Sequence, residues 1–326
     1  MSRRLHRIVT IGGGSGQFTL LNGLRTVGDL RITAVVSMVD SGGSTGRLRD
    51  ELGILPPGDV LKCILALSPH ADFARTIFLK RFQAHRRLRG HNAGNMLLTM
   101  LGQYTGSFPA GIRALCEILD VRGQILPVTM DRATLVAELS DGTRIYGEAA
   151  IDLPAGTRHQ KIRDVYLVPH HHAEISVHPP VIEAIVRAQT IVIGPGDLYT
   201  SIFPNLIVPG VCEALRQAPA RLVYTLNIMN KFGETHQFTG RDFVRVLEAR
   251  LQRRLDVVIY NTRRPPPQIL ARYRRYRSEF VGLDPLDPFW GPRRLVGADL
   301  LDSGGGIVRH DDQKLAALIE GLIREG

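Results

Sequence analysis

The chain has 326 residues, a formal net charge of +10 and an isoelectric point near 9.9, and 44% of its residues are hydrophobic. This length and apolar content suffice for a sizeable core in one large domain or two smaller ones. No apolar run reaches the length of a bilayer-spanning helix, and the N-terminus leads into a strand pattern instead of the apolar core of a signal peptide. Three widely spaced cysteines, without C-x-x-C spacing, favour reduced thiols over a disulfide framework or a zinc site. We therefore expect a globular cytoplasmic protein without membrane insertion.

Two glycine-rich loops follow β-branched runs near the N-terminus. Residues 8–11 predict a strand, residues 19–24 a helix and residues 32–39 a second strand, with Gly-Gly-Gly-Ser-Gly at 12–16 and Ser-Gly-Gly-Ser-Thr-Gly at 41–46. This pattern is typical of a βαβ unit. Glycine lets backbone N–H groups approach an anion, and a following helix N-terminus adds its positive dipole. Both loops therefore predict a phosphorylated ligand.

The first glycine loop departs from both well-known phosphate fingerprints. Counting from Gly12, the dinucleotide pattern G-x-G-x-x-G requires glycine where Gln17 stands, and no Gly-Lys-Ser/Thr triplet follows to form a P-loop. An ordinary dehydrogenase or ATPase is therefore disfavoured. The alternative to phosphate binding is a tight strand-to-helix turn without a ligand, and the second loop weighs against it.

The middle of the chain changes from helical to strand periodicity. The predicted helices are residues 60–67, 73–82, 93–104 and 110–119. The predicted strands are residues 126–129, 134–139 and 144–148. Because a turn of Ser-Asp-Gly-Thr joins the last two strands, we expect a β-rich insertion here.

Strands and helices alternate again toward the C-terminus. The strands are predicted at residues 190–193, 222–226 and 257–260, and the helices at residues 211–217 and 241–251. Such alternation argues for an α/β fold with a mainly parallel sheet and helices on both faces. Residues 265–267 and 284–294 are rich in turn-forming residues and are interpreted as surface connections.

Ligands of open α/β sheets bind beyond the carboxyl ends of the strands, where loops converge. The segments expected to meet there are residues 12–16, 40–47, 90–95, 194–201 and 227–231. Residues 194–201 combine glycines with a carboxylate and three hydroxyl side chains between a buried strand and the next helix. We interpret them as a third anion-binding turn.

Several polar residues in these segments have two interpretations each. Asp40 closes the second strand, where a carboxylate binds either a ribose hydroxyl or a divalent cation. Asp59 begins the next helix and serves either as a second ligand of that cation or as a helix N-cap. Arg47 neutralises a phosphate or forms a structural salt bridge. His91 and Asn92 either recognise a base or sugar or cap the helix that follows.

The net positive charge is carried mainly by arginine and is compatible with nucleic-acid binding. Basic residues are concentrated at 86–89 and 272–277, and we interpret both runs as solvated helix faces in preference to nucleic-acid contacts. The sequence has no known helix-turn-helix or sheet-platform signature for nucleic-acid binding. The histidines at 170–172 have no carboxylate or cysteine at ligand spacing, which favours a solvated loop over a metal site.

Motifs in a fixed order span nearly the whole chain: GGGSG, DSGGSTGRLR, PPGD, GHNAGN, GPGDLYTSIFPNL and NKFGET. Together they resemble the YvcK group of CofD-like proteins. The resemblance implies a Rossmann-like core in a single domain, with a nucleotide-binding half at residues 1–124, the β-rich insertion at 125–180 and a second α/β half at 181–326. It also implies a bacterial cytoplasmic gluconeogenesis factor that is linked to carbon metabolism and cell shape and binds UDP-sugars such as UDP-N-acetylglucosamine.

The wider family includes 2-phospho-L-lactate transferase, which makes a deazaflavin cofactor precursor from a nucleotide-activated phospholactate. In that branch, acidic positions matching Asp40 and Asp59 help to hold magnesium, so the resemblance makes Mg²⁺ the candidate cofactor. Many relatives carry paired aspartates where this chain has Asp40-Ser41, and a hydroxyl residue where it has Asn92. Both differences weigh against transferase chemistry. We therefore expect a UDP-sugar-binding regulator without turnover, with a magnesium-dependent transferase as the alternative.

The same resemblance places Asn230 in a late strand-end motif, and Tyr273 and Arg309 at positions that close over the UDP-sugar. The expected partners are a UDP-sugar or related nucleotide and an unidentified protein, while self-association is left open. The predicted ligand-binding residues are Gly12, Gly13, Gly14, Ser15, Gly16, Asp40, Ser41, Gly42, Gly43, Ser44, Arg47, His91, Asn92, Asn95, Gly194, Gly196, Asp197, Tyr199, Thr200, Ser201, Asn230, Tyr273 and Arg309.

Overall fold

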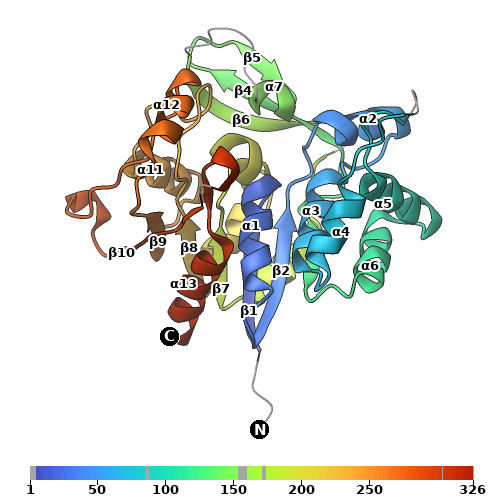
Figure 1. The fold of residues 1–326 in the computed structure, drawn as a ribbon, viewed down its shortest axis with the longest axis horizontal. Coiled ribbons are helices and arrows are strands. Elements are labelled where there is room, and N and C mark those ends of the chain that lie inside the picture. The colour runs from blue at the N-terminus through green and yellow to red at the C-terminus, as the bar shows by residue number, and fades with distance from the viewer. Residues whose placement is uncertain (1–4, 85–87, 153–159, 171–173, 303, 326) are drawn as a thin grey trace.

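The computed structural model describes residues 5–84, 88–152, 160–170, 174–302 and 304–325. Its centre is a seven-stranded sheet in the order β10-β9-β8-β7-β1-β2-β3, and every strand pair in it is parallel (Figure 1). The predicted α/β fold with a parallel sheet is therefore confirmed. The strands are β1 His6–Gly12, β2 Leu30–Val36, β3 Gln124–Pro127, β7 Thr190–Ile193, β8 Arg221–Thr225, β9 Val257–Asn261 and β10 Arg294–Ala298.

The strand order reverses beside β1. From β1 the chain continues to β2 and β3 on one side, whereas β7 pairs with the other side of β1 and is followed outward by β8, β9 and β10. A ligand crevice forms at the carboxyl ends of the strands at such a reversal. The glycine turns at 12–16 and 194–196 directly follow β1 and β7, so both lie at this crevice.

Helices cover both faces of the sheet, as right-handed crossovers between parallel strands require. In Figure 1, α1 lies in front of the sheet between α3 and α13, which both pack against it. On the opposite face α10 packs against α8 and α11. These helices are α1 Gly14–Leu24, α3 Gly58–Leu67, α8 Pro179–Arg187, α10 Val211–Gln217, α11 Gly240–Leu251 and α13 Asp312–Arg324.

Shorter elements complete the two ends of the sheet. Beside β3, the helices α4, α5 and α6 pack around α3. The remaining elements of the main body are α2 Gly43–Leu52, α4 Ala71–Phe78, α5 Ala93–Tyr104, α6 Phe108–Ile118, the π-helix η1 Leu198–Ile202, α9 Phe203–Leu206, α12 Pro267–Arg275, η2 Pro288–Trp290, β11 Leu301–Asp302, η3 Gly304–Gly306 and β12 Arg309–His310.

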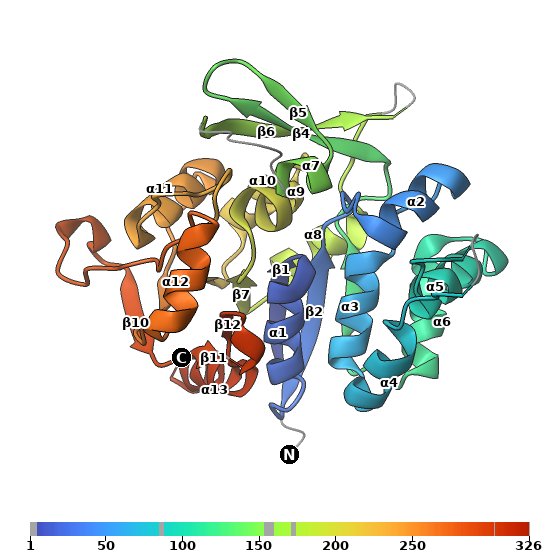
Figure 2. The ribbon, with the colours of Figure 1, turned by 45° about the horizontal axis from the view of Figure 1, so that its top comes forward.

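The β-rich insertion forms a separate three-stranded antiparallel sheet in the order β5-β4-β6. With α7 it lies over the carboxyl ends of the parallel strands (Figure 2). The strand predicted at 126–129 falls in the main sheet, because β3 pairs with β2, so the separate sheet begins after it. The insertion comprises β4 Ala133–Leu139, β5 Arg144–Tyr146, α7 Glu148–Asp152 and β6 Ile162–Pro169.

Buried runs of aliphatic residues account for the central strands. The four residues of β7 are all buried, and so are the last five residues of β1 and of β2. Such continuous apolar runs are typical of parallel strands with helices on both faces. One glycine of α1 is also needed for packing: a Cβ on Gly23 would lie 2.0 Å from the carbonyl oxygen of Asp312, so α13 approaches α1 closely there.

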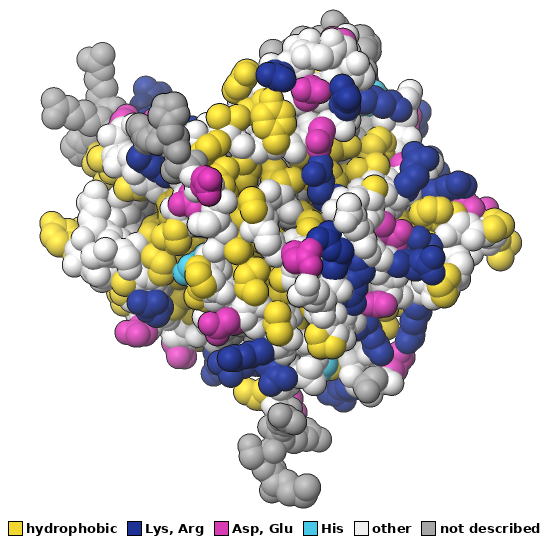
Figure 3. All heavy atoms as spheres, turned by 180° about the vertical axis from the view of Figure 1, so that it is seen from behind, with side chains coloured by type: hydrophobic (Ala, Val, Ile, Leu, Met, Phe, Trp, Pro, Cys, Tyr) yellow, Lys and Arg dark blue, Asp and Glu magenta, His cyan; other side chains and the backbone are white. Residues whose placement is uncertain are grey.

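Among the described residues, no single helix is long and apolar enough to cross a bilayer. The bent pair Leu198–Leu206 and Val211–Gln217 has the required length and composition only when the two segments are taken together. Most of the apolar side chains of that pair are buried in the core. The view from behind in Figure 3 shows Lys and Arg spread over the surface, with Asp, Glu and apolar side chains among them.

Candidate functional site

A cavity of about 1030 Å³ lies at the strand-order reversal, beneath the insertion. Its walls come from the loops after β1, β2, β7 and β8, from α3 and α7, and from the segments around α12 and β12. The structure thus brings together residues from both halves of the chain. The predicted residues that line it are Gly13, Gly14, Ser15, Gly16, Asp40, Asp59, Gly196, Asp197, Thr200, Ser201, Asn230, Tyr273 and Arg309.

The N-terminus of α1 presents backbone N–H groups to this cavity. Gly13 is the N-cap and supplies no side-chain cap, and Gly14 has a φ of +63°, a left-handed conformation that favours glycine. Gln17 has turned away from the cavity into the core. Its amide donates to the Val35 carbonyl at 3.0 Å and to Thr10 Oγ1 at 3.2 Å. The turn therefore keeps free donors at its tip, while Gln17 ties β1 to β2.

The first and third glycine turns pack directly on each other. A Cβ on Gly16 would lie 2.2 Å from the carbonyl oxygen of Pro195, so only glycine allows this approach. Asn227 holds the third turn from the other side, because its Nδ2 donates to the Gly196 carbonyl at 2.9 Å. Together these contacts place the N-terminus of α1, Gly196 and Ser201 along one wall.

Asp40 and Asp59 form an acidic wall next to the first turn. A Cβ on Gly13 would lie 2.9 Å from Asp59 Oδ2, and one on Gly58 would lie 2.6 Å from Asp40 Oδ2. Burial, followed by the charge of Asp59, raises the pKa of Asp40. The Lys62 ammonium contacts Asp59 Oδ1 at 2.8 Å, and the Asp59 charge raises the pKa of Lys62.

These contacts bear on the two interpretations of Asp59. The N-cap position of α3 is Pro57, and Asp59 lies in the first turn without capping it, paired with Lys62. Carboxylate oxygens are the ligands that Mg²⁺ prefers, and Asp40 and Asp59 face the same cavity, so the pair fits a hard divalent cation. These two residues would hold the cation that the transferase branch implies.

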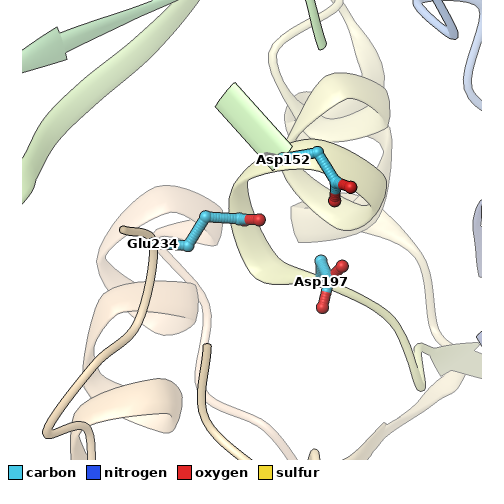
Figure 4. Close-up of side chains that lie close together, drawn as sticks. All are labelled: Asp152, Asp197 and Glu234. Carbon is cyan, nitrogen blue, oxygen red and sulfur yellow. The ribbon is translucent and has the colours of Figure 1, made fainter. Parts of the chain in front are cut away.

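A lysine and three carboxylates from three different segments form a cluster at the cavity, and all of them except the buried Glu234 line it. Lys231 pairs with Asp152 of α7, with Asp197 at 2.8 Å and with Glu234 at 3.1 Å. Figure 4 shows the three carboxylates turned toward one another. Their oxygens lie within 4.8 Å of one another, close enough to bind a metal ion, but the Lys231 ammonium contacts all of them.

The charges of this cluster shift the pKa values of its members. Burial and the Asp197 charge raise the pKa of Glu234 to about 8, against the opposing effect of Lys231. Burial alone would lower the pKa of Lys231, but the three carboxylates raise it above its ordinary value. Lys231 therefore stays charged and joins the insertion to the loops after β7 and β8.

Another part of the cavity wall is basic and aromatic. Arg272 and Arg275 of α12, Arg277 just after it, and Arg309 of β12 are exposed and line the cavity. The predicted solvated face of 272–277 is thus exposed, but part of it faces the cavity. Tyr273 fixes the local geometry, because its hydroxyl accepts a hydrogen bond from the Val308 N–H at 2.9 Å.

The second glycine loop and residues 90–95 lie beside the cavity and contact each other. Ser44 Oγ and His91 Nδ1 are 3.1 Å apart, and Asn92 caps α5 by accepting from the Asn95 N–H at 2.7 Å. Arg47 donates to the Arg89 carbonyl at 2.8 Å. Burial lowers the pKa of His91. The predicted residues that do not line the cavity are Gly12, Ser41, Gly42, Gly43, Ser44, Arg47, His91, Asn92, Asn95, Gly194 and Tyr199.

Part of the cavity wall could not be named from the sequence. Lys62 lies one helical turn after Asp59, a spacing that indicates a pair with it but no ligand. Glu148 and Asp152 belong to the insertion, and nothing in their local sequence places α7 over the main sheet. Of the runs noted above, residues 86, 87, 171 and 172 lie outside the described residues.

The fold and the cavity define a Rossmann-like α/β protein with a polar ligand site at the strand-order reversal. The sequence matches the CofD family, described as 2-phospho-L-lactate transferase CofD, over residues 8–293. It is 40% identical to the "Putative gluconeogenesis factor" of Thermotoga maritima, with 98% of this chain and 99% of the relative covered. It is 35% identical to the "Gluconeogenesis factor" of Bacillus subtilis, with 98% of each covered. The chain belongs to the CofD family and, within it, to the gluconeogenesis factors.

A solved structure agrees with this assignment. A crystallised member of the upf0052 family from Bacillus halodurans is 36% identical and superposes with a TM-score of 0.89, covering 96% of this chain and 99% of that protein. The similarity therefore extends over nearly the whole fold.

Proposed function

We propose that this protein binds a UDP-sugar, such as UDP-N-acetylglucosamine, in the cavity at the strand-order reversal. The observation that carries the proposal is the approach of two glycine turns, after β1 and β7, which leaves the N–H groups at the start of α1 facing a cavity. A helix N-terminus with free N–H groups and its positive dipole end is suited to a diphosphate.

The size and the side chains of the cavity support a nucleotide ligand. Its volume of about 1030 Å³ is at the upper end of the range of small-molecule sites. Arg272, Arg275 and Arg309 offer guanidinium groups, which bind phosphate in a bidentate manner. Tyr273 and Tyr276 line the same side, and aromatic rings are suited to stacking with a nucleobase.

We further propose that the protein acts as a cytoplasmic regulator without turnover. The relatives are named gluconeogenesis factors, which supports a link to carbon metabolism, and the proposed role extends to cell shape. A ligand regulates only if it binds two conformations with different affinity, so the bound state must differ at a surface that a partner protein contacts. Ligand occupancy would then report the supply of nucleotide sugar to that partner.

Thermal unfolding with and without ligand tests the binding step. At about 100 times its dissociation constant a ligand stabilises the folded state by about 2.7 kcal/mol, which raises the Tm of a chain of this size by roughly 5 °C. We expect this shift with UDP-N-acetylglucosamine and a smaller one with UMP or NAD at equal concentration. A shift with NAD alone would contradict the proposed ligand.

Incubation of the same samples with Mg²⁺ and acceptor molecules tests the absence of turnover. The regulator is expected to leave the UDP-sugar intact. The transferase alternative would place Mg²⁺ at Asp40 and Asp59 and use arginines to stabilise the diphosphate leaving group. The regulator hypothesis would be wrong if UDP is released only when an acceptor is present and this release is lost in Asp59→Asn. The protein would then be an enzyme.

A further inference from the structure

The charges that line the cavity are unevenly distributed, and this arrangement orients a ligand. Arginines line the side formed by α12 and β12, whereas the side formed by the loop after β2, by α3 and by α7 carries Asp40, Asp59 with its partner Lys62, and Glu148. The N-terminus of α1 lies between the two sides. A diphosphate bound at that N-terminus with its nucleoside toward the arginines and tyrosines leaves its outer substituent among the carboxylates. Carboxylates are suited to hydrogen bonds with hydroxyl groups, and they repel a further anionic group.

Glu148 is held in this acidic side by contacts with the loop after β2. The Ala149 N–H donates to Ser41 Oγ at 2.9 Å, and the Ser41 N–H donates to Glu148 Oε2 at 3.4 Å. These contacts fasten α7 to the main body at its first residues, while Asp152 fastens its end to Lys231. Glu148 therefore faces the cavity from a segment that is anchored at both ends.

We propose that Glu148 is the residue that selects the outer substituent of the ligand, by exchanging hydrogen bonds with the hydroxyl groups of a sugar. This inference rests on the proposed binding of a UDP-sugar. It assigns to the insertion a direct part in recognition, in which the carboxyl group accepts hydrogen bonds from the sugar hydroxyl groups. A ligand that ends at the outer phosphate does not reach Glu148.

Three carboxylates and one backbone N–H surround Glu148. The groups that face it are Asp40 after β2, Asp59 at the start of α3, Asp152 at the end of α7 and the Ser41 N–H. Burial and the charges of Asp40 and Asp152 raise the pKa of Glu148 to about 7. The neighbouring carboxylates are further acceptors for the hydroxyl groups of a sugar.

Calorimetric titration of UDP and UDP-N-acetylglucosamine into three variants of the full chain tests the assignment. Glu148→Ala is expected to weaken UDP-N-acetylglucosamine about tenfold, the effect of one lost hydrogen bond, and to leave UDP within about twofold. Glu148→Gln keeps a hydrogen-bond acceptor at nearly the same place, so it should bind the UDP-sugar within about threefold of the wild-type chain and more tightly than Glu148→Ala. Glu138→Gln is the matched control, because Glu138 lies on β4 of the same insertion, paired with Arg144 and Arg163 and away from the cavity.

The outcomes separate the inference from the function on which it rests. If Glu148→Ala weakens UDP and UDP-N-acetylglucosamine equally, or neither, Glu148 does not select the sugar and the inference is overturned. The same conclusion follows if Glu148→Gln weakens UDP-N-acetylglucosamine as much as Glu148→Ala does. If the wild-type chain binds neither compound, the proposed function fails, and the inference fails with it.

Discussion

Gly16→Ala is expected to destabilise the fold by about 3 kcal/mol and to abolish ligand binding. A Cβ at this position would lie 2.2 Å from the carbonyl oxygen and 2.6 Å from the carbonyl carbon of Pro195, and both are backbone atoms that cannot rotate away. Either α1 or the turn at 194–196 must shift, which separates the two turns that form the proposed phosphate site. For a chain of this size the loss corresponds to a decrease in Tm of roughly 6 °C in calorimetry.

Gly28→Ala is the matched control for this substitution. Gly28 is exposed, its φ is not in the left-handed region, and a Cβ there would meet no atom within 4 Å. Its replacement should leave stability unchanged or raise it by up to about 1 kcal/mol, because alanine restricts the unfolded chain. Equal Tm values for both variants would show that the contact between the glycine turns contributes nothing to the fold.

Lys231→Met is expected to cost about 3 kcal/mol of folding free energy at pH 9 and less at pH 6. The substitution leaves Asp152, Asp197 and the buried Glu234 within 4.8 Å of one another without their shared cation. The pKa of Glu234 is already raised to about 8, and loss of the ammonium raises it further. A carboxyl whose pKa is higher in the folded state stabilises that state while it is protonated and loses this effect as pH rises, so the deficit grows with pH.

Chemical denaturation of Lys231→Met at the two pH values measures this effect. The control is Lys314→Met, since Lys314 is half-exposed and its nearest carboxylates are 3.6 Å and 4.0 Å away, so the change should stay within about 0.5 kcal/mol. Because the three carboxylates then resemble a calcium site, Ca²⁺ should stabilise Lys231→Met and not the wild-type chain. A deficit that is independent of pH and of Ca²⁺ would contradict this description of the cluster.

The sequence predicted the elements that have strong local patterns. The bounds of α5, β7 and α10 agree with the predicted residues 93–104, 190–193 and 211–217, because each is an apolar run that ends in turn or capping residues. The two glycine turns that pack together were also predicted, because glycines directly follow the strand patterns of β1 and β7 in the sequence. Local chemistry was sufficient in these cases.

Elements that depend on distant contacts were not predicted. The glycines at 42 and 43 belong to the start of a helix, because α2 begins at Gly43. The prolines at 179–180 and 267 lie at the starts of α8 and α12, where proline is well tolerated. The periodicity of residues 126–129 indicated a strand but not its partner, β2. Glu148 reaches the cavity only because the insertion lies over the sheet, and no local signal specifies that packing.

A crystal structure of the protein with UDP-N-acetylglucosamine would locate the ligand. We expect the diphosphate within hydrogen-bond distance of the backbone N–H groups of Ser15 or Gly16 and near Gly196, with the sugar toward Glu148. A well-ordered ligand outside this cavity, for example in the smaller pocket of about 560 Å³ between α6, β3 and α8, would contradict it.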